Sequence, residues 1–353
     1  MTRRHIAAAA LAATLMTTIA ATGCGDEAAA DSAAGDEEIV AAQAPFTIPD
    51  KSQARVAEYW TPARMRAAVP YEPATGKATE DEAHYPSEGT ACVRSAESCT
   101  NGEGAYAYDR TPADPAGIPG RSVGKVFFSK AGKPYVCSGS VVESANRSVV
   151  WTAGHCVANR GQFHSNWIFV PGYRDGVAPN GRWVPRAGQS SMTLAKWLDD
   201  RDGRYDLAAV VLASEGGQGV AERVGSLPIV FDQSPEPGQP VRILGYPQAA
   251  PFDGSDLEVC VGQVAERDEP PYINDSEEDG SSTAPAPGTP SGYRVGCDLT
   301  GGASGGPFLL GPADDGTGGS VFSVVSSGPV TAVTGAYQGE LARALWERAQ
   351  TFE

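Results

Sequence analysis

From residue 122 of 353 onward, the sequence contains a series of short apolar runs that are rich in β-branched residues. Gly, Pro, Asn and Asp separate these runs, and both the run lengths and the residue types are those of β-strands. Examples are VGKVFF (123–128), SVVWTA (148–153), DLAAVVL (206–212) and VFSVVSSG (321–328). Strands that follow one another without intervening helices indicate an all-β barrel or sandwich. We therefore predict an all-β fold for residues 122–353.

One segment at the C-terminus departs from this strand pattern. ELARALWERA (340–349) places apolar residues at Leu341, Ala344, Leu345 and Ala349, which is the spacing of an amphipathic helix. A second helical pattern, AEYWTPARMRAAVPYE, covers residues 57–72. The predicted shape is thus a β-domain closed by a C-terminal helix.

The overall charge excludes one class of partner. Lys and Arg number 27 against 43 Asp and Glu, so the net charge is −16. Nucleic-acid binding needs a basic face that displaces counterions from phosphates. We therefore expect no nucleic-acid partner.

Residues 1–24 have the pattern of a secretory signal peptide, because Arg3 and Arg4 precede an apolar stretch at 6–21. Export implies an oxidising compartment, in which disulfides persist. The stretch ends Ala21-Thr22-Gly23-Cys24, which resembles a bacterial lipobox and would make Cys24 the lipidated first residue of the mature protein. The alternative is ordinary cleavage after a small residue, with Cys24 lost or free.

The rest of the chain divides by composition. Residues 25–46 are small and acidic and predict a disordered tether. Residues 47–121 are interpreted as a prosegment or as an N-terminal extension that packs on the main domain, which covers 122–353. The stretch 266–290 holds seven acidic residues and five prolines and predicts a solvated loop. Its carboxylate spacing fits no EF-hand, so we expect no metal site there.

Three short motifs contain the residues that point to chemistry: TAGHC (152–156), YDLAAV (205–210) and GGASGGP (301–307). Ser304 sits among glycines, which give backbone N–H groups close access to a developing oxyanion. A serine hydroxyl needs a neighbouring base to become a nucleophile. Of the four histidines, His155 alone lies at a strand end beside a cysteine, and it is the predicted general base. His5 and His84 precede the domain, and we expect His164 on the surface.

Asp206 is the predicted partner of His155, because it opens an apolar strand, where a carboxylate needs a partner. Asp199, Asp200 and Asp202 are competitors, although none leads directly into a core strand.

These motifs, in the order His, Asp, Ser, resemble those of the chymotrypsin-fold (trypsin-like) serine proteases, in particular the bacterial trypsin-like and glutamyl-endopeptidase-like branch. VRILGYP (241–247) is also similar to a strand of this branch. The resemblance covers about residues 122–353 and implies two six-stranded antiparallel β-barrels with a C-terminal helix. It implies that Ser304 attacks the scissile carbonyl, that His155 accepts the proton and that Asp206 holds the imidazole. It also assigns the oxyanion hole to the backbone N–H groups of Gly302 and Ser304.

The resemblance also implies a cysteine pairing. The family joins a cysteine on the strand before the catalytic histidine to one just after it, which here are Cys137 and Cys156. Cys260 and Cys297 would form a second bridge, and Cys92 with Cys99 a third. Cys24 would then remain outside the disulfide set, as the lipid anchor requires.

Two departures from the family pattern concern activation and specificity. Ala303 stands where many of these enzymes carry an aspartate that pairs with a new amino terminus after zymogen cleavage, so we expect that switch to be absent. Cleavage of a prosegment after Arg121 stays open. The resemblance places Asp298, Leu299, Ser326 and Gly328 at the substrate pocket. Asp298 would favour Arg or Lys, yet glutamate preference and other specificities stay open.

The sequence therefore predicts a secreted or lipid-anchored serine endopeptidase that works through an acyl-enzyme. Its expected partners are protein or peptide substrates, and we expect a monomer without metal or cofactor on the outer face of the bacterial cell membrane or outside the cell. Two alternatives are a non-catalytic surface binding module on the same fold and an esterase that uses the same triad.

Overall fold

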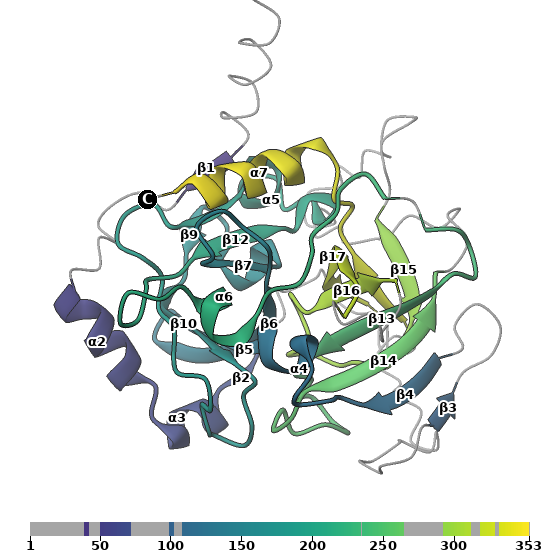
Figure 1. Ribbon diagram of the computed structural model, residues 1–353, viewed down its shortest axis with the longest axis horizontal. Coiled ribbons are helices and arrows are strands. Elements are labelled where there is room, and N and C mark those ends of the chain that lie inside the picture. The colour runs from purple at the N-terminus through teal and green to yellow at the C-terminus, as the bar shows by residue number, and fades with distance from the viewer. Residues whose placement is uncertain are drawn as a thin grey trace, which may run out of the picture.

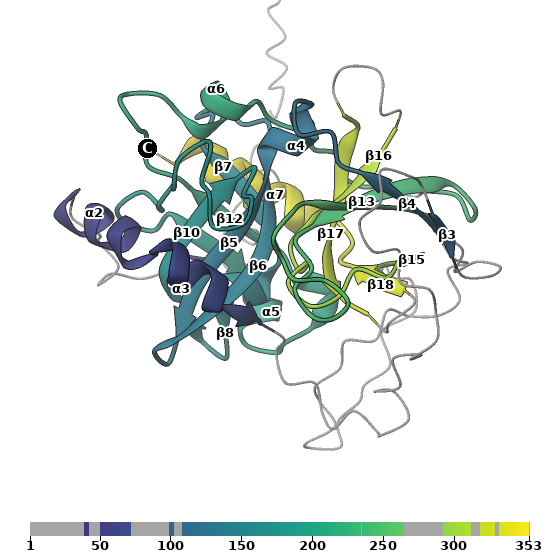
Figure 2. The ribbon, with the colours of Figure 1, turned by 90° about the horizontal axis from the view of Figure 1, so that it is seen from below.

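A computed structural model describes residues 39–41, 50–71, 99–101, 108–233, 235–264, 292–311, 318–328 and 332–352. The predicted signal peptide, Cys24, Cys92 and the acidic 266–290 stretch lie outside these ranges. Two sheets of eight strands each form two barrel-like bodies that lie side by side, as Figure 1 and Figure 2 show. The two-barrel, all-β fold expected from the sequence is confirmed.

The N-terminal barrel consists of the sheet with the order β1-β11-β12-β7-β6-β5-β10, in which β2 also pairs with β6. Two of its eight strands, β1 and β2, come from before residue 122, which leaves six strands from the predicted domain. These six are β5 (Val123–Lys130), β6 (Lys133–Val141), β7 (Val149–Thr152), β10 (Ser165–Pro171), β11 (Ser191–Leu194) and β12 (Ala208–Val211). Phe127, Trp151 and Phe169 are fully buried in this part of the chain.

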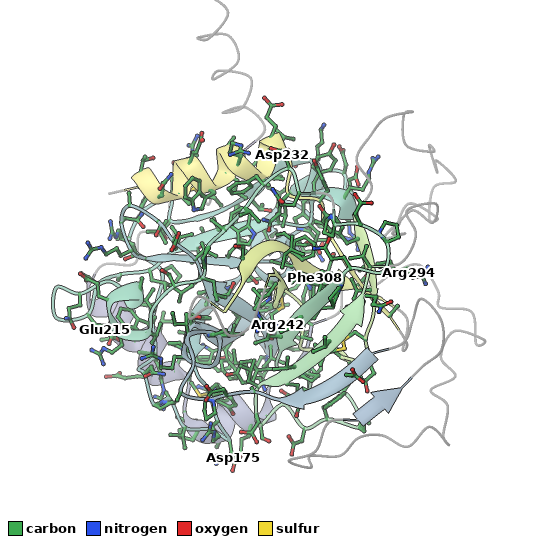
Figure 3. All side chains as sticks on the ribbon, turned by 45° about the vertical axis from the view of Figure 1, so that its right-hand side comes forward. Asp175, Glu215, Asp232, Arg242, Arg294 and Phe308 are labelled. Atoms are coloured by element: carbon green, nitrogen blue, oxygen red, sulfur yellow. A yellow bond between two sulfur atoms is a disulfide. The ribbon has the colours of Figure 1, made fainter. Side chains whose placement is uncertain are left out.

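The C-terminal barrel has the strand order β15-β18-β17-β16-β13-β14-β4-β3. Its six strands after residue 122 are β13 (Pro240–Gly245), β14 (Glu258–Gln263), β15 (Tyr293–Gly296), β16 (Pro307–Leu310), β17 (Ser320–Ser327) and β18 (Ala332–Gly335). A bridge between Val264 and Val295 brings the two sides of the sheet together. Figure 3 shows Phe308 inside this barrel, where its ring lies 6.0 Å from that of Phe322, while Asp175 and Asp232 lie at the molecular surface.

Helices and short strands complete the described domain. Helix α7 (Glu340–Thr351), in yellow in Figure 1, packs on β11 and β12 of the N-terminal barrel and buries Ala342, Leu345 and Ala349. It confirms the predicted C-terminal helix. The remaining short elements are α4 (Ile118–Ser122), η2 (Gly154–Cys156), β8 (Ala158–Asn159), β9 (Gln162–Phe163), α5 (Ala195–Leu198), η3 (Gly203–Tyr205) and α6 (Val220–Val224).

The segment before residue 122 is built into both barrels. The helical pattern at 57–72 is two helices rather than one, α2 (Asp50–Tyr59) and α3 (Pro62–Ala67), because Pro62 starts a new helix that Thr61 caps. Both helices, purple in Figure 2, lie against the N-terminal barrel. Trp60 and Met65 are fully buried, and Trp60 Nε1 donates to Asn166 O at 2.6 Å.

Short strands attach the same region to the sheets. β2 (Val69–Pro70) runs parallel to β6, while β3 (Cys99–Asn101) and β4 (Tyr108–Pro112) extend the C-terminal barrel from β14. β1 (Ile39–Ala41) pairs with β11. The prediction of a disordered tether over 25–46 is therefore wrong for residues 39–41, because Ile39 and Ala41 are buried when the strand docks.

Within the described ranges, the helices are all too short or too polar to cross a lipid bilayer.

Candidate active site

His155 and Asp206 form a buried pair at the end of two neighbouring strands. β7 ends at Thr152 and the η2 turn then carries His155, while η3 delivers Asp206 just before β12, the partner of β7. His155 Nδ1 lies 2.7 Å from Asp206 Oδ2, and the backbone N–H of His155 donates to Asp206 Oδ1 at 2.7 Å. The two side chains are 0% and 1% exposed. The carboxylate thus fixes both the ring and the main chain of the histidine.

The competing aspartates have other surroundings. Asp202 forms an ion pair with Arg204 and accepts a hydrogen bond from the Arg204 backbone, while Asp199 and Asp200 are exposed. Only Asp206 among these four reaches His155. Since both contacts of Asp206 to His155 are buried, water does not compete for the carboxylate oxygens.

Ser326 supplies a third hydrogen bond to this carboxylate. Its hydroxyl donates to Asp206 Oδ2, and the serine is buried on β17 of the other barrel. Ser326 is one of the residues predicted at the substrate pocket, and its link to Asp206 was not expected from the sequence. This hydrogen bond ties the His155–Asp206 pair to the C-terminal barrel. A strand-end serine gives no sequence signal for this contact, because 120 residues separate the partners.

Ser304 lies in the turn between β15 and β16 and is 8% exposed. Its carbonyl accepts a hydrogen bond from the N–H of Ser138 at 2.7 Å, and Cys156 Sγ lies 3.5 Å from the same oxygen. The main chain of Ser304 thus packs against Cys156, the residue that follows His155. His155 Nε2 is buried without a hydrogen-bond partner among the described residues, so the Ser304 hydroxyl does not donate to it in this structure. Such contacts in proteases without substrate are often long and tighten when substrate binds.

Two backbone N–H groups in the serine turn have no hydrogen-bond acceptor among the residues that the structure describes. Neither the N–H of Gly302 nor that of Ser304 donates a hydrogen bond to any residue in the described part of the chain. Gly302 has φ +103°, and a Cβ there would lie 2.6 Å from Tyr246 O. Gly305 has φ +81°, and a Cβ there would lie 2.0 Å from Thr152 Oγ1. Only glycine fits these two positions, which explains the glycine-rich motif.

Two disulfides brace the site. Cys137 on β6 is bonded to Cys156 beside His155, and Cys260 on β14 is bonded to Cys297 before the serine turn. The first pair is the one that the family resemblance implies, and the second joins the two cysteines that remained in the same domain. Cys92 lies outside the described residues, and for Cys99 only the main chain is described, so the third pairing stays a prediction.

The residues assigned to the substrate pocket lie on two segments beside Ser304. Asp298 is partly exposed, and a carboxylate oxygen lies within 4.8 Å of the sulfurs of Cys260 and Cys297. Leu299 is buried. Gly328 passes so close to β18 that a Cβ would lie 2.2 Å from Ala332 O. The main chain at Gly328 therefore has no space for a side chain on that side.

One prediction about a histidine is wrong. His164, expected on the surface, is 8% exposed; its Nε2 lies 2.9 Å from His155 O and its ring stacks on Phe128 at 4.4 Å. Burial lowers its pKa from 6.5 to about 3, so it is neutral at pH 7. Since a carbonyl oxygen only accepts, Nε2 carries the proton and donates it to His155 O. The polar sequence around His164 misled the prediction, because the covering groups, Phe128 and Tyr71, come from distant segments.

Comparisons with known proteins agree with this architecture. The family profile of the trypsin-like peptidase domain matches residues 137–312, a range that includes all three motifs. The crystal structure of protease Anisep from Arthrobacter nicotinovorans is 31% identical, over 66% of this chain and 96% of that one, with a TM-score of 0.54. A thermostable serine protease, AL20, from an extremophilic microorganism is 36% identical, over 67% of this chain and 100% of that one, with a TM-score of 0.55. No curated protein sequence matches the chain. The fold, the sequence identity and the buried histidine–aspartate pair together show that this chain belongs to the trypsin-like serine proteases and is a serine endopeptidase.

Proposed function

We propose that the chain cleaves peptide bonds through a His155–Asp206–Ser304 triad and a covalent acyl-enzyme. Ser304 Oγ attacks the scissile carbonyl carbon while His155 Nε2 takes the hydroxyl proton. The carbonyl oxygen becomes an oxyanion that accepts hydrogen bonds from the N–H groups of Gly302 and Ser304. The C–N bond then breaks, and His155 gives its proton to the departing amine. Water, deprotonated by His155, hydrolyses the ester and releases the acid.

The observation that carries this proposal is the orientation of the His155 ring. Asp206 can only accept at Nδ1, so the ring proton stays on Nδ1 and the lone pair stays on Nε2. Nε2 is buried and has no partner among the described residues, so its lone pair is available to accept the proton of the serine hydroxyl. Ser326 and the His155 N–H hold the carboxylate in place. These contacts support His155 as the general base and Asp206 as the carboxylate that orients it.

Labelling with a fluorophosphonate probe tests the triad directly. We expect the parent protein to be labelled and to hydrolyse casein, and the Ser304→Ala variant to do neither. Ser214→Ala removes an exposed serine and is the matched control, which should label like the parent. Labelling that survives Ser304→Ala would identify another nucleophile. An unlabelled, folded parent would favour the non-catalytic binding module, and turnover of esters without amides would favour the esterase.

The pocket proposal concerns the residue before the cleaved bond. Asp298, Leu299, Ser326 and Gly328 line the substrate pocket in this proposal, and the Asp298 carboxylate attracts a cationic side chain of the substrate. Cleavage-site profiling on a peptide library would read the preference, and Asp298→Ser should reduce kcat/KM for Arg and Lys sites while sparing apolar sites. A dominant preference for glutamate would contradict this assignment.

We also propose the cellular context. Residues 1–24 direct export, and Cys24 receives the lipid that anchors the mature chain outside the cell. Metabolic labelling with palmitate should mark the parent but not Cys24→Ser, and mass spectrometry of the mature N-terminus should find it at Cys24. Release of an unlipidated chain that starts elsewhere would contradict the anchor and leave the protease proposal intact.

A further inference from the structure

The oxyanion hole depends on one peptide bond that is flanked by two glycines. The Gly301–Gly302 peptide carries the Gly302 N–H, one of the two proposed donors. Without a Cβ on either side, rotation of this peptide meets little steric resistance, so its orientation must be fixed by contacts from elsewhere. Many enzymes of the chymotrypsin type carry an aspartate at the position that follows Gly302. In this chain that position is Ala303, which is fully buried and whose side chain has no polar group. A different set of contacts must therefore hold the turn.

The carbonyl group of the same peptide is hydrogen-bonded to the loop that begins at Gln248. Gly301 O accepts hydrogen bonds from the N–H of Gln248 at 2.7 Å and from the N–H of Ala249 at 3.2 Å. In a planar trans peptide the C=O and N–H bonds point in opposite directions. When Gln248 holds the Gly301 carbonyl, the Gly302 N–H must point away from Gln248, and it has no acceptor there among the described residues.

The side chain of Gln248 is held by two hydrogen bonds, one to the N-terminal barrel and one to the segment before residue 122. Its Oε1 accepts a hydrogen bond from Lys125 Nζ at 2.6 Å, and its Nε2 donates to the carbonyl of Ala68, between α3 and β2. Gln248 is therefore clamped between a lysine of the N-terminal barrel and the segment that precedes the domain. The loop that carries it cannot shift away from Gly301 without breaking one of these contacts.

Lys125 itself is an unusual residue for its position. It lies on β5, is 1% exposed, and its Nζ donates to Gly254 O at 2.7 Å as well as to Gln248. The ring of Tyr173 lies 5.0 Å from the nitrogen. Lysine is almost never fully buried unless it has partners, since desolvation of the ammonium is costly. Its two oxygen partners both lie on the 248–254 loop beside the serine turn.

We propose that Lys125 is a positioning residue that, through Gln248, holds the Gly301–Gly302 peptide with its N–H facing the oxyanion. This inference rests on the proposed triad and oxyanion hole. It gives the chain a way to build the hole without an aspartate at position 303 and without a newly cut amino terminus.

The network does not depend on the charge of the lysine. Burial lowers the pKa of Lys125 from 10.5 to about 7, while the nearby Asp253 acts in the opposite direction. A neutral amine still has two N–H donors, which match the two acceptors on Gln248 and Gly254. The contacts therefore persist on both sides of neutral pH, and the test must measure catalysis rather than a pH profile alone.

The experiment compares Lys125→Met, Gln248→Met and the double variant with the parent on a peptide amide. Met keeps the length of each side chain but removes its donors and acceptors. Loss of one oxyanion donor costs about 10²–10³ in kcat, and loosening a donor should cost about tenfold. We expect each single variant to lose about tenfold in kcat with KM changed less than about twofold, because the hole acts in the transition state. The double variant should lose no more than the worse single variant.

Lys133→Met, on the exposed part of the same hairpin, is the control and should match the parent. A folded Lys125→Met variant with parental kcat would overturn the inference, as would losses that multiply in the double variant. If Lys125→Met does not fold, the partly exposed Gln248→Met decides: an unchanged kcat overturns the inference and a tenfold loss supports it. A parent that neither labels with fluorophosphonate nor cleaves overturns the triad as well, so the two failures are distinguishable.

Discussion

The carboxylate of Asp206 binds His155 twice, with one oxygen 2.7 Å from the ring Nδ1 and the other 2.7 Å from the backbone N. Oδ2 also accepts the Ser326 hydroxyl, so three donors converge on a side chain that is 1% exposed. Such an arrangement leaves the imidazole one tautomer and one orientation. It also makes the function of the site sensitive to the chemistry of this one carboxylate.

Asp206→Asn should therefore abolish most activity while preserving the fold. An amide can donate to Nδ1, which moves the ring proton to Nε2 and removes the lone pair that receives the serine proton. We expect kcat on a peptide amide to fall by about 10⁴ with little change in KM. The control is Asp199→Asn, at an exposed aspartate that directly follows α5, and it should retain parental kcat. Parental activity in Asp206→Asn would show that another group orients His155.

The buried His164 predicts a specific acid sensitivity. Its folded pKa is about 3 against 6.5 in the unfolded chain. As pH falls below about 6.5, the unfolded chain gains a proton that the native state excludes, so the free energy of unfolding decreases by up to about 1.4 kcal/mol per pH unit. The groups that face the ring are Phe128, Tyr71, Lys130 and His155.

His164→Gln removes this titration and keeps a donor for His155 O. Urea unfolding of parent and variant between about pH 7 and about pH 4.5 isolates the effect, because other acidic groups are common to both proteins. We expect the parent to lose stability relative to the variant as pH falls. Parallel stability curves would contradict the burial of a neutral histidine.

Lys125 predicts a free energy of unfolding that rises with pH in the alkaline range, which is the same direction of change as for His164 at acidic pH. Its folded pKa is about 7 and its ordinary value is 10.5, so above about pH 7 the unfolded chain holds a proton that the native state lacks. The parent should therefore become more stable relative to Lys125→Met as pH rises from about 7 to about 9, by about 1 kcal/mol per unit. Asp253 and Tyr173 face the Lys125 amine in the parent, and both residues are unchanged in Lys125→Met. Lys133→Met provides the baseline, and a constant difference between parent and Lys125→Met would contradict the shift.

The 50–71 segment should be a permanent part of the folded enzyme. Trp60 is fully buried, its ring lies 5.4 Å from that of Phe127, and its Nε1 donates to Asn166 O. Trp60→Ala should lower the free energy of unfolding by about 3–5 kcal/mol, measured by urea denaturation. Val69→Ala, at a residue that is 51% exposed in the same segment, should change it by less than about 0.5 kcal/mol.

The mature protein gives a second readout of this segment. Intact mass should include residues 50–71, and a chain that starts at Ser122 should express poorly, because it lacks Trp60, Met65 and the Ala68 carbonyl that binds Gln248. A stable and active enzyme that starts at Ser122 would restore the prosegment interpretation. A Trp60→Ala variant with an unchanged free energy of unfolding would also restore the prosegment interpretation.

Much of the fold and the buried His155–Asp206 pair could be predicted, because both follow from local sequence. β5, β6, β7, β10, β12, β13 and β17 fall on the β-branched runs, since a strand's alternating pattern is written within a few residues. His155, Asp206 and Ser304 could be selected because proton transfer and acyl transfer each require a particular residue type beside a strand end or among glycines. The order of the motifs then identified the family.

The strands, the His155–Asp206 pair and the glycine-rich turn could be predicted from the amino-acid sequence, because they depend on neighbours along the chain. What covers each residue depends on the three-dimensional packing of distant segments. This packing buried His164 under Phe128, tied Ser326 to Asp206 across 120 residues and set Lys125 against Gln248 across 123. It also made residues 39–41 of the predicted tether into a strand, and it packed residues 50–71 of the predicted prosegment or N-terminal extension onto the N-terminal barrel. Burial and long-range hydrogen bonds depend on which distant segments meet, and a local pattern does not specify that meeting.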